Sequence, residues 1–521
     1  MTNEATRLRW LVYGMLIMAS GGGMAARIFS VQSKSRKTPL LSANDRSRWS
    51  MIRAVVDERQ FHIDDVIMPN GKRDREWYTI DMVRHRGPDG KEHYYSSKPP
   101  LFPLVVAAEY AALQRATGLR IAERPYYVVR VLLVITNLVP ILFYLWLAVL
   151  LCERLGTTDT ARLFCAAAAC FGTFTTTYAN TLNNHVPAVI GVMGALYLAI
   201  TIWQDDRREW WRFLVAGLCA GVAAANELPA LSFLCLTGAA LLCKAPVKTI
   251  IGYGGGVAAI AAAFFAATLT VHDSWRPPYA HRSNGEERVV LDVPELPDGP
   301  LAAEIREQFS QADCPLGEAA VVRNSAGGQR QVWDEESQNR FALVANGQQL
   351  RVLNWDNWYD YDRSYWMQDK KGVDKGEPDQ ATYAVHVLVG HHGVFSLTPL
   401  WLISIWGVGC WLVAGKPWQR GLAFSIALLT VVCLGFYLAR PLADRNYGGV
   451  NCGFRWAIWL IPLWFAALVR GADNLLSSRV CRAVALLFLA ASVFSAQFAA
   501  ANPWTHPWVY QYWQYLEWIV E

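Results

Sequence analysis

Charged residues are scarce in this sequence: Lys, Arg, Asp and Glu make up only 17% of its 521 residues, whereas 53% are hydrophobic. So little charge excludes an ordinary soluble globular protein and indicates a polytopic membrane protein. The net charge of +5 is small for this length, so we expect no nucleic-acid partner. No two of the 11 cysteines form a Cys-x-x-Cys pair, which argues against a zinc ribbon or a thiol redox motif.

Hydrophobic segments are abundant and predict about eleven transmembrane helices. They cover residues 8–29, 126–151, 163–178, 186–203, 213–225, 228–242, 250–271, 394–413, 422–438, 456–469 and 483–498. The first has a basic start, as a signal peptide does, but it is long enough to span, so we expect an uncleaved anchor. Residues 101–113 are short for a span and contain Pro103 and Glu109, so we expect an interfacial or re-entrant helix there.

The distribution of Lys and Arg supports this topology. With residues 101–113 excluded as a span, most short loops rich in Lys and Arg fall on the cytoplasmic side. The outer turns near Asn183 and Glu227 carry neither residue type. One outer loop, from Arg440 to Arg455, contains three arginines. These arginines contradict the topological bias, and an anionic ligand would explain them.

The same topology places several polar clusters on the outer face. They are Asp57-Glu58, Tyr94–Lys98, Asn183–His185, Glu227, His391-His392 and Asp444–Arg455. Ionisable residues beside apolar spans are costly and are candidates for function. The alternative for any single one is an interfacial side chain wetted by water.

We therefore predict an all-α polytopic membrane protein with a small α+β or β-rich extracytoplasmic insert. Residues 1–271 form an N-terminal transmembrane region whose first outer loop, 31–125, is catalytic. Residues 272–390 form the insert, in which short alternating runs predict β-hairpins. Its last segment, NWDNWYDYDRSYW, suits either sugar stacking or a small packed core. Residues 391–500 return to the membrane, and residues 501–521 form an interfacial aromatic tail.

Four motifs resemble the GT-C membrane glycosyltransferases, in particular the aminoarabinose transferase and protein mannosyltransferase group. They are the Asp-Glu pair, the run YYSSKPPLFP, the turn TLNNH and the loop RNYGGVNCGFRW. The resemblance covers about residues 8–468. In relatives with Glu-Lys-Pro-Pro the acidic residue helps to hold a metal, but Ser97 occupies that position here. No cofactor is therefore assigned, and a divalent metal ion is left open.

The resemblance implies an inverting transferase that moves a sugar from a polyprenyl-phosphate donor to a lipid, glycan or protein acceptor. It implies an inner (plasma) membrane protein whose site faces the periplasm or exterior. Asp57 would be the general base, and Lys98 and Arg455 would hold the phosphate. The other substrate-binding candidates are Glu58, Tyr95, Asn184, His185, Glu227, His391, His392 and Tyr447.

Each assignment has an alternative. Asp57 and Glu58 could cap the helix that follows them. Lys98 and Arg455 could be interfacial side chains. The weak metal candidates are Glu58 and His392, although adjacent histidines are poorly placed to share one ion. A transporter or flippase of a lipid-linked or anionic substrate would use the same arginines and aromatics, but the sequence shows no internal repeat.

Overall fold

The computed structural model describes residues 2–519 and divides into two compact units, each of which we describe by itself. The first unit comprises residues 1–45, 108–264 and 371–521. The second comprises residues 46–107 and 265–370, so it combines part of the first polar loop with most of the long polar insert.

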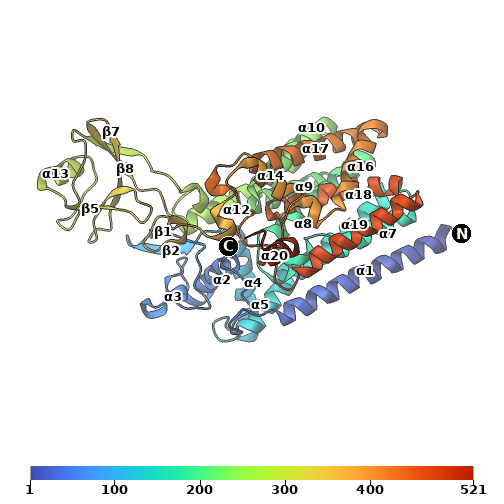
Figure 1. Ribbon diagram of the computed structural model, residues 1–521, viewed down its shortest axis with the longest axis horizontal. Coiled ribbons are helices and arrows are strands. Elements are labelled where there is room, and N and C mark those ends of the chain that lie inside the picture. Colours follow the sequence, from blue (N-terminus) through green and yellow to red (C-terminus); the bar gives the residue numbers. More distant parts are fainter. Residues whose placement is uncertain (1, 520–521) are drawn as a thin grey trace. The chain divides into compact units, whose positions relative to one another are not determined.

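Helices make up most of the first unit (Figure 1). They are α1 (Thr2–Ser30), α5 (Pro125–Leu133), α6 (Val139–Leu155), α7 (Asp159–Phe171), α8 (His185–Gln204), α9 (Trp210–Asn226), α10 (Leu231–Lys244), α11 (Pro246–Lys248), α14 (Gln380–Leu388), α15 (Val394–Leu397), α16 (Trp401–Ala414), α17 (Pro417–Leu438), α18 (Ile461–Leu475), α19 (Arg479–Phe498) and α20 (Trp508–Tyr515). Helices α2 (Ala43–Arg53), α4 (Leu101–Thr117) and α12 (Gly254–His272) each contain a boundary between the units.

Helix α18 is the most buried of the long apolar helices and packs against α16, α7, α6 and α8. Helices α18 and α16 pack closely because a glycine of each helix lies against the backbone of the other helix. A Cβ on Gly407 would lie 1.9 Å from the Ala467 carbonyl oxygen, and one on Gly471 would lie 2.1 Å from that of Ile403. Small residues at such crossings let helix backbones pack tightly in a membrane.

Seven helical segments among the described residues are long and apolar enough to cross a membrane, which indicates a multi-pass membrane protein. They are Glu4–Ser30, Pro125–Leu155, His185–Gln204, Pro246–His272, Pro417–Leu438, Arg455–Leu475 and Arg479–Phe498. Leu228–Lys244 and Trp401–Ala414 are shorter apolar helices. The predicted total of eleven spans is not confirmed, because the helices at 159–171 and 210–226 also fall short of this length.

The second unit contains the β-structure. Strands β1 (Met82–Arg86) and β2 (Glu92–Ser96) form an antiparallel hairpin. The other six strands form one sheet in the order β3-β8-β7-β6-β5-β4. They are β3 (Glu287–Leu291), β4 (Gly299–Pro300), β5 (Val321–Asn324), β6 (Arg330–Trp333), β7 (Arg340–Asn346) and β8 (Gln349–Asn354). Helix α13 (Ala303–Gln311) lies beside this sheet (Figure 1), and its Phe309 is buried among sheet residues such as Val332. The predicted hairpins of the insert are confirmed.

The aromatic and acidic segment NWDNWYDYDRSYW forms hydrogen bonds with other residues of the second unit. Asp356 Oδ2 accepts a hydrogen bond from Arg276 (2.8 Å), and its other oxygen faces His281. Asp360 is buried and accepts hydrogen bonds from Ser325 Oγ (2.6 Å) and the Gly327 backbone N–H (3.2 Å). The sequence left sugar stacking and a small packed core open for this segment. Asp356 and Asp360 are part of a packed core.

Candidate active site

Asp57 and Glu58 lie at the end of the first helical segment of the second unit. Helix α2 runs into a short π-helical turn, Ala54–Glu58, which ends where Arg59 adopts a left-handed φ of 56°. Asp57 is half-buried and Glu58 is exposed. The next helix, α3, begins only at Asp64, so the pair does not cap it. Because π-helical turns often occur at functional positions, the setting suits a reactive carboxylate.

Lys98 and Tyr95 are positioned by the β1–β2 hairpin. Lys98 follows β2, and its Nζ lies 3.0 Å from Asp81 Oδ2, just before β1. The largely buried ring of Tyr95 stacks on that of His85, with 4.1 Å between centroids. Asp81 therefore fixes the cation of Lys98, whereas one face of the Tyr95 ring is already covered by an imidazole.

Asn184, His185 and Glu227 meet in the first unit. Glu227 Oε1 accepts a hydrogen bond from Asn184 Nδ2 (2.6 Å) and lies 2.5 Å from His185 Nδ1. Asn183 positions this turn, because its Oδ1 accepts the backbone N–H groups of His185 (2.9 Å) and Val186 (3.0 Å) at the start of α8. The carboxylate and imidazole are both buried, so the turns at Asn183–His185 and Glu227 are joined by a polar contact inside the unit.

Aromatic side chains connect this contact to Arg455. The ring of Tyr178 packs edge-on against His185, with 5.3 Å between centroids, and against Trp504, with 5.7 Å. The guanidinium of Arg455 lies over the Trp504 ring, 5.3 Å from its centroid. The structure thus brings together three predicted elements of the first unit: the Asn183–His185 turn, Glu227 and the arginine-containing loop.

The loop before Arg455 is built around its asparagines and glycines. Asn451 Nδ2 donates to the carbonyl oxygens of Tyr447 (2.9 Å) and Gly449 (2.7 Å). Gly448 has a φ of 92°, and a Cβ there would lie 2.2 Å from Arg455 Nε. Glycine is therefore required at 448 both for its backbone conformation and for the room it leaves to Arg455.

His391, His392 and Tyr447 form a second cluster of the first unit. His391 Nδ1 and His392 Nδ1 lie 2.5 Å apart, and the His392 ring stacks on Tyr447, with 4.1 Å between centroids. Tyr447 Oη donates to Glu377 Oε1 (2.5 Å). Burial, followed by the charges of His386 and His506, lowers the pKa of His391 to about 3. The imidazoles of this cluster are therefore neutral at physiological pH.

Two groups of described residues have the composition of a metal site, and both include residues that the sequence analysis did not select. One is Glu377, His386 and His391, and the other is His62, Asp64 and His93. Glu58 and His392 belong to neither group. The sequence signal for the second group was the segment FHIDD, which follows the Asp-Glu pair after Arg59-Gln60, together with a histidine in the strand before Lys98.

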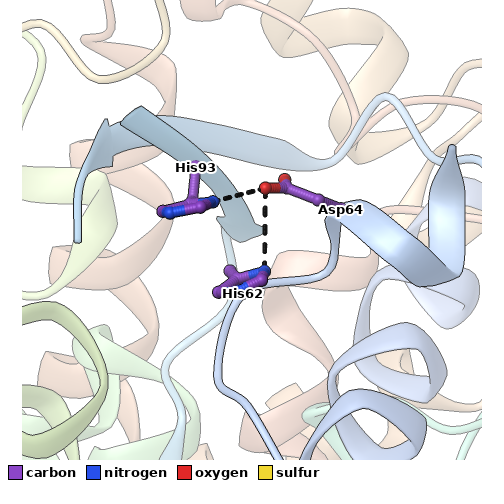
Figure 2. Close-up of side chains that lie close together, drawn as sticks. All are labelled: His62, Asp64 and His93. Carbon is purple, nitrogen blue, oxygen red and sulfur yellow. Dashed lines mark hydrogen bonds and ion pairs between the residues drawn. The ribbon is translucent and has the colours of Figure 1, made fainter. Parts of the chain in front are cut away.

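Figure 2 shows His62 and His93 turned toward the same oxygen of Asp64. His93 Nδ1 lies 2.6 Å from Asp64 Oδ2, and His93 Nε2 lies 3.0 Å from Asp89 Oδ2. Burial alone would lower the pKa of His93, but its hydrogen bonds to Asp64 and Asp89 outweigh burial and raise it. For His62, burial and the neighbouring His93 lower the pKa.

The predicted site residues therefore form separate sets. Asp57, Glu58, Tyr95 and Lys98 belong to the second unit, and the others belong to the first. The first unit offers a cation in Arg455 and polar groups suited to hydroxyls in Asn184 and Glu227. The second offers a half-buried carboxylate in Asp57 and a cation in Lys98.

The solved structures that resemble this chain include two transferases. The Archaeoglobus fulgidus oligosaccharyltransferase in its apo form has a TM-score of 0.44 at 10% identity; the match covers 97% of this chain but only 57% of that protein. The S. cerevisiae protein O-mannosyltransferase Pmt1-Pmt2 complex, bound to its sugar donor, has a TM-score of 0.42 at 12% identity, with 97% of this chain and 92% of that one covered.

Both TM-scores lie below 0.5, so no family or reaction is assigned to this chain from these likenesses. No protein-family model and no curated protein matches the chain.

Proposed function

We propose that this protein is an inverting glycosyltransferase that uses a polyprenyl-phosphate sugar donor and acts on the extracytoplasmic side of the membrane. Arg455 carries this proposal. It lies in the outer loop predicted from the sequence, its Nε is buried without a hydrogen-bond partner among residues 2–519, and it forms no ion pair there. A guanidinium placed in this way suits a phosphate, which it can bind through two parallel N–H groups.

The other arginines of the loop are engaged by the protein. Arg440 Nη2 bonds Asp444 Oδ2 at 2.7 Å. Arg445 donates from Nε to the carbonyl oxygen of Arg440 (2.9 Å) and from Nη1 to that of Pro378 (3.1 Å). Arg455 is thus the arginine of this loop that is available to a ligand, and its contact with Trp504 holds the guanidinium plane in place.

The proposed reaction is a single displacement at the anomeric carbon. Asp57 takes the proton of the acceptor hydroxyl, whose oxygen then forms the new glycosidic bond. The bond between the anomeric carbon and the phosphate oxygen breaks, and the polyprenyl phosphate leaves with its electron pair. Arg455 stabilises the charge that develops on this phosphate. Lys98, which pairs with Asp81, is the second cation that the sequence motifs assign to the phosphate. One displacement inverts the anomeric configuration, as in inverting sugar hydrolysis.

Glu227, Asn184 and His185 bind the substrate in this proposal. Their polar atoms form one hydrogen-bonded group, and aromatic rings lead from it to Arg455. Sugar hydroxyls are recognised by such fixed carboxylate and amide groups. Tyr95 and Tyr447 act by holding His85 and His392, since their rings stack on those imidazoles.

The test is sugar transfer by the purified full-length chain, followed as release of polyprenyl phosphate from a mixture of polyprenyl-phosphate sugars. Asp57→Asn is expected to lower the rate by roughly 100-fold or more, because general-base catalysis contributes about that much. Asp65→Asn removes one exposed carboxylate nearby and is the matched control, expected to keep the wild-type rate.

Full activity in Asp57→Asn would remove the general-base assignment. Movement of an intact lipid-linked substrate across proteoliposomes, without release of polyprenyl phosphate, would instead favour a transporter or flippase.

A further inference from the structure

We propose that His62, Asp64 and His93 form a binding site for a divalent transition-metal ion, with zinc as the best match. This inference is independent of the proposed glycosyl transfer. It rests on how the polar loop is fixed to the β1–β2 hairpin, on where three ligand atoms point, and on the groups that surround them (Figure 2).

The backbone holds the three residues in one place. Ile63, between the first two ligands, is fully buried, and its N–H donates to the Tyr94 carbonyl oxygen (2.8 Å). In return the Tyr94 N–H donates to Asp64 Oδ1 (2.7 Å). Tyr94 follows His93 in β2, so these two hydrogen bonds fix the segment 62–64 against the strand that carries the third ligand.

The ligand atoms lie at the spacing of a small coordination sphere. Asp64 Oδ2 is 2.6 Å from His93 Nδ1 and 3.6 Å from His62 Nδ1. Tetrahedral zinc ligands lie about 3.4 Å from one another, a value between these two distances. The two imidazole rings are stacked, with centroids 4.2 Å apart, so their planes must open for both nitrogens to point at one ion.

The groups around the ligands match those that metal sites use. His93 turns its other nitrogen, Nε2, to Asp89 Oδ2 at 3.0 Å, and a histidine that binds a metal usually donates from its second nitrogen to a carboxylate. Asp64 Oδ1 is held by the Tyr94 N–H, which leaves Oδ2 for the ion. His62 Nδ1 is buried and has no hydrogen-bond partner among the described residues. A cation would satisfy this nitrogen.

The ligand set indicates the class of ion. Two imidazoles and one carboxylate suit zinc and related transition metals, whereas calcium and magnesium prefer oxygen ligands throughout. The three side chains are only partly buried, with 24%, 27% and 17% of their surfaces exposed, so a fourth position is open to water or to a ligand. Three protein ligands with one open position are the composition of reactive zinc sites.

The experiment measures metal in the purified full-length chain. The protein is dialysed free of metal, titrated with zinc and analysed by plasma mass spectrometry. Cobalt then replaces zinc, so that visible d–d absorption reports on coordination. The wild type is expected to bind zinc and to show the cobalt bands. Asp64→Asn and His62→Asn are expected to lose both.

His62→Asn keeps the hydrogen bonds of Asp64 to Tyr94 and His93, so loss of metal in this variant is not a consequence of a disrupted hairpin. Asp89→Asn leaves all three ligands and is expected to weaken zinc binding by about 10–100-fold. Two control variants are expected to bind zinc as the wild type does. Asp65→Asn changes a neighbouring carboxylate, and Glu377→Gln changes the group of Glu377, His386 and His391. Unchanged zinc binding in both His62→Asn and Asp64→Asn, or loss of zinc only in Glu377→Gln, would overturn the proposal.

Discussion

At the scale of a single residue, the count of Lys and Arg in each loop predicts the loop that contains Arg455 but does not single out Arg455 itself. The loop from Arg440 to Arg455 contains more arginines than its predicted side of the membrane should carry, but the sequence does not rank these three arginines. Their partners decide which one is available, and those partners come from distant segments, such as Pro378 for Arg445 and Trp504 for Arg455. Sequence alone thus predicted the loop, and the contacts single out the residue.

His391 leads to a prediction about acid stability. Its folded-state pKa of about 3 lies below that of an unfolded histidine, about 6.5. As pH falls below about 6.5, the unfolded chain takes up a proton that the folded chain does not, so stability is lost toward acid. For this group the loss is about 1.4 kcal/mol per pH unit.

The measurement is the apparent melting temperature of the purified protein between pH 7 and pH 5. The wild type is expected to melt at progressively lower temperature as the pH falls, and His391→Gln is expected to show a shallower decline. Equal pH dependence in the two proteins would contradict the account of a buried neutral imidazole.

At the scale of elements, the alternation of apolar and polar residues predicted the strands of the insert. The apolar run at residues 163–178, by contrast, did not predict where helix α7 ends. The hairpin β7–β8 follows from the alternating run RFALVANGQQLRVLNW. Asn346 pairs with Gln349, so Gly347 and Gln348 form a two-residue turn, and Gly347 has a φ of 66°. The helix predicted to continue to Tyr178 instead ends at Phe171. Asn137 Nδ2 donates to the carbonyl oxygens of Ala179 (3.0 Å) and Thr181 (2.8 Å), which stabilises the irregular turn from a distant helix.

The group of His62, Asp64 and His93 also depends on contacts between segments that are distant in the sequence. His62 and Asp64 are close in sequence, but His93 joins them only because the loop hydrogen-bonds to β2. No local periodicity indicates that pairing. The segment FHIDD therefore carried a signal for metal ligands that became clear only from the fold.

The loop before Arg455 gives a matched pair of glycine variants. Gly448 and Gly449 have φ values of 92° and 79°, so alanine is strained at either position. Only at 448 would the new Cβ meet Arg455, 2.2 Å from Nε, whereas at 449 it would lie 3.4 Å from an Asp374 oxygen. We expect Gly448→Ala to weaken polyprenyl-phosphate binding several-fold more than Gly449→Ala.

Both variants are compared in a binding titration after their melting temperatures have been measured. The backbone strain is similar, roughly 1 kcal/mol at each site, so comparable stability losses are expected. Equal binding by the two variants would show that the position of Arg455 does not matter for the ligand.

At the scale of the whole molecule, composition was sufficient to predict a multi-pass membrane protein. The number of spans was harder to predict, since several apolar segments form helices of only 13–17 residues, for example α7 and α9. An apolar run in a sequence does not reveal where a helix stops when side chains from elsewhere bond its last carbonyl groups.

The positive-inside count makes a prediction about topology. Residues 31–125 and 272–390 are both expected on the extracytoplasmic side, whereas the loop at Arg207-Arg208 is expected in the cytoplasm. Single cysteines placed in a cysteine-free variant and labelled with a membrane-impermeant thiol reagent in intact cells measure this. Labelling of the two long segments but not of the short loop is the expected pattern; labelling of only one long segment would contradict the topology.

In the proposed function, Arg455 binds the phosphate of a lipid-linked donor. The most direct measurement is the equilibrium affinity of the purified chain for polyprenyl phosphate, compared between Arg455→Gln and Arg440→Gln. A hydrogen bond to a charged group is worth about 1.5–3 kcal/mol, so Arg455→Gln is expected to bind at least roughly tenfold more weakly. Arg440→Gln, whose guanidinium pairs with Asp444, is expected to bind as the wild type does. Wild-type affinity in Arg455→Gln would contradict the account.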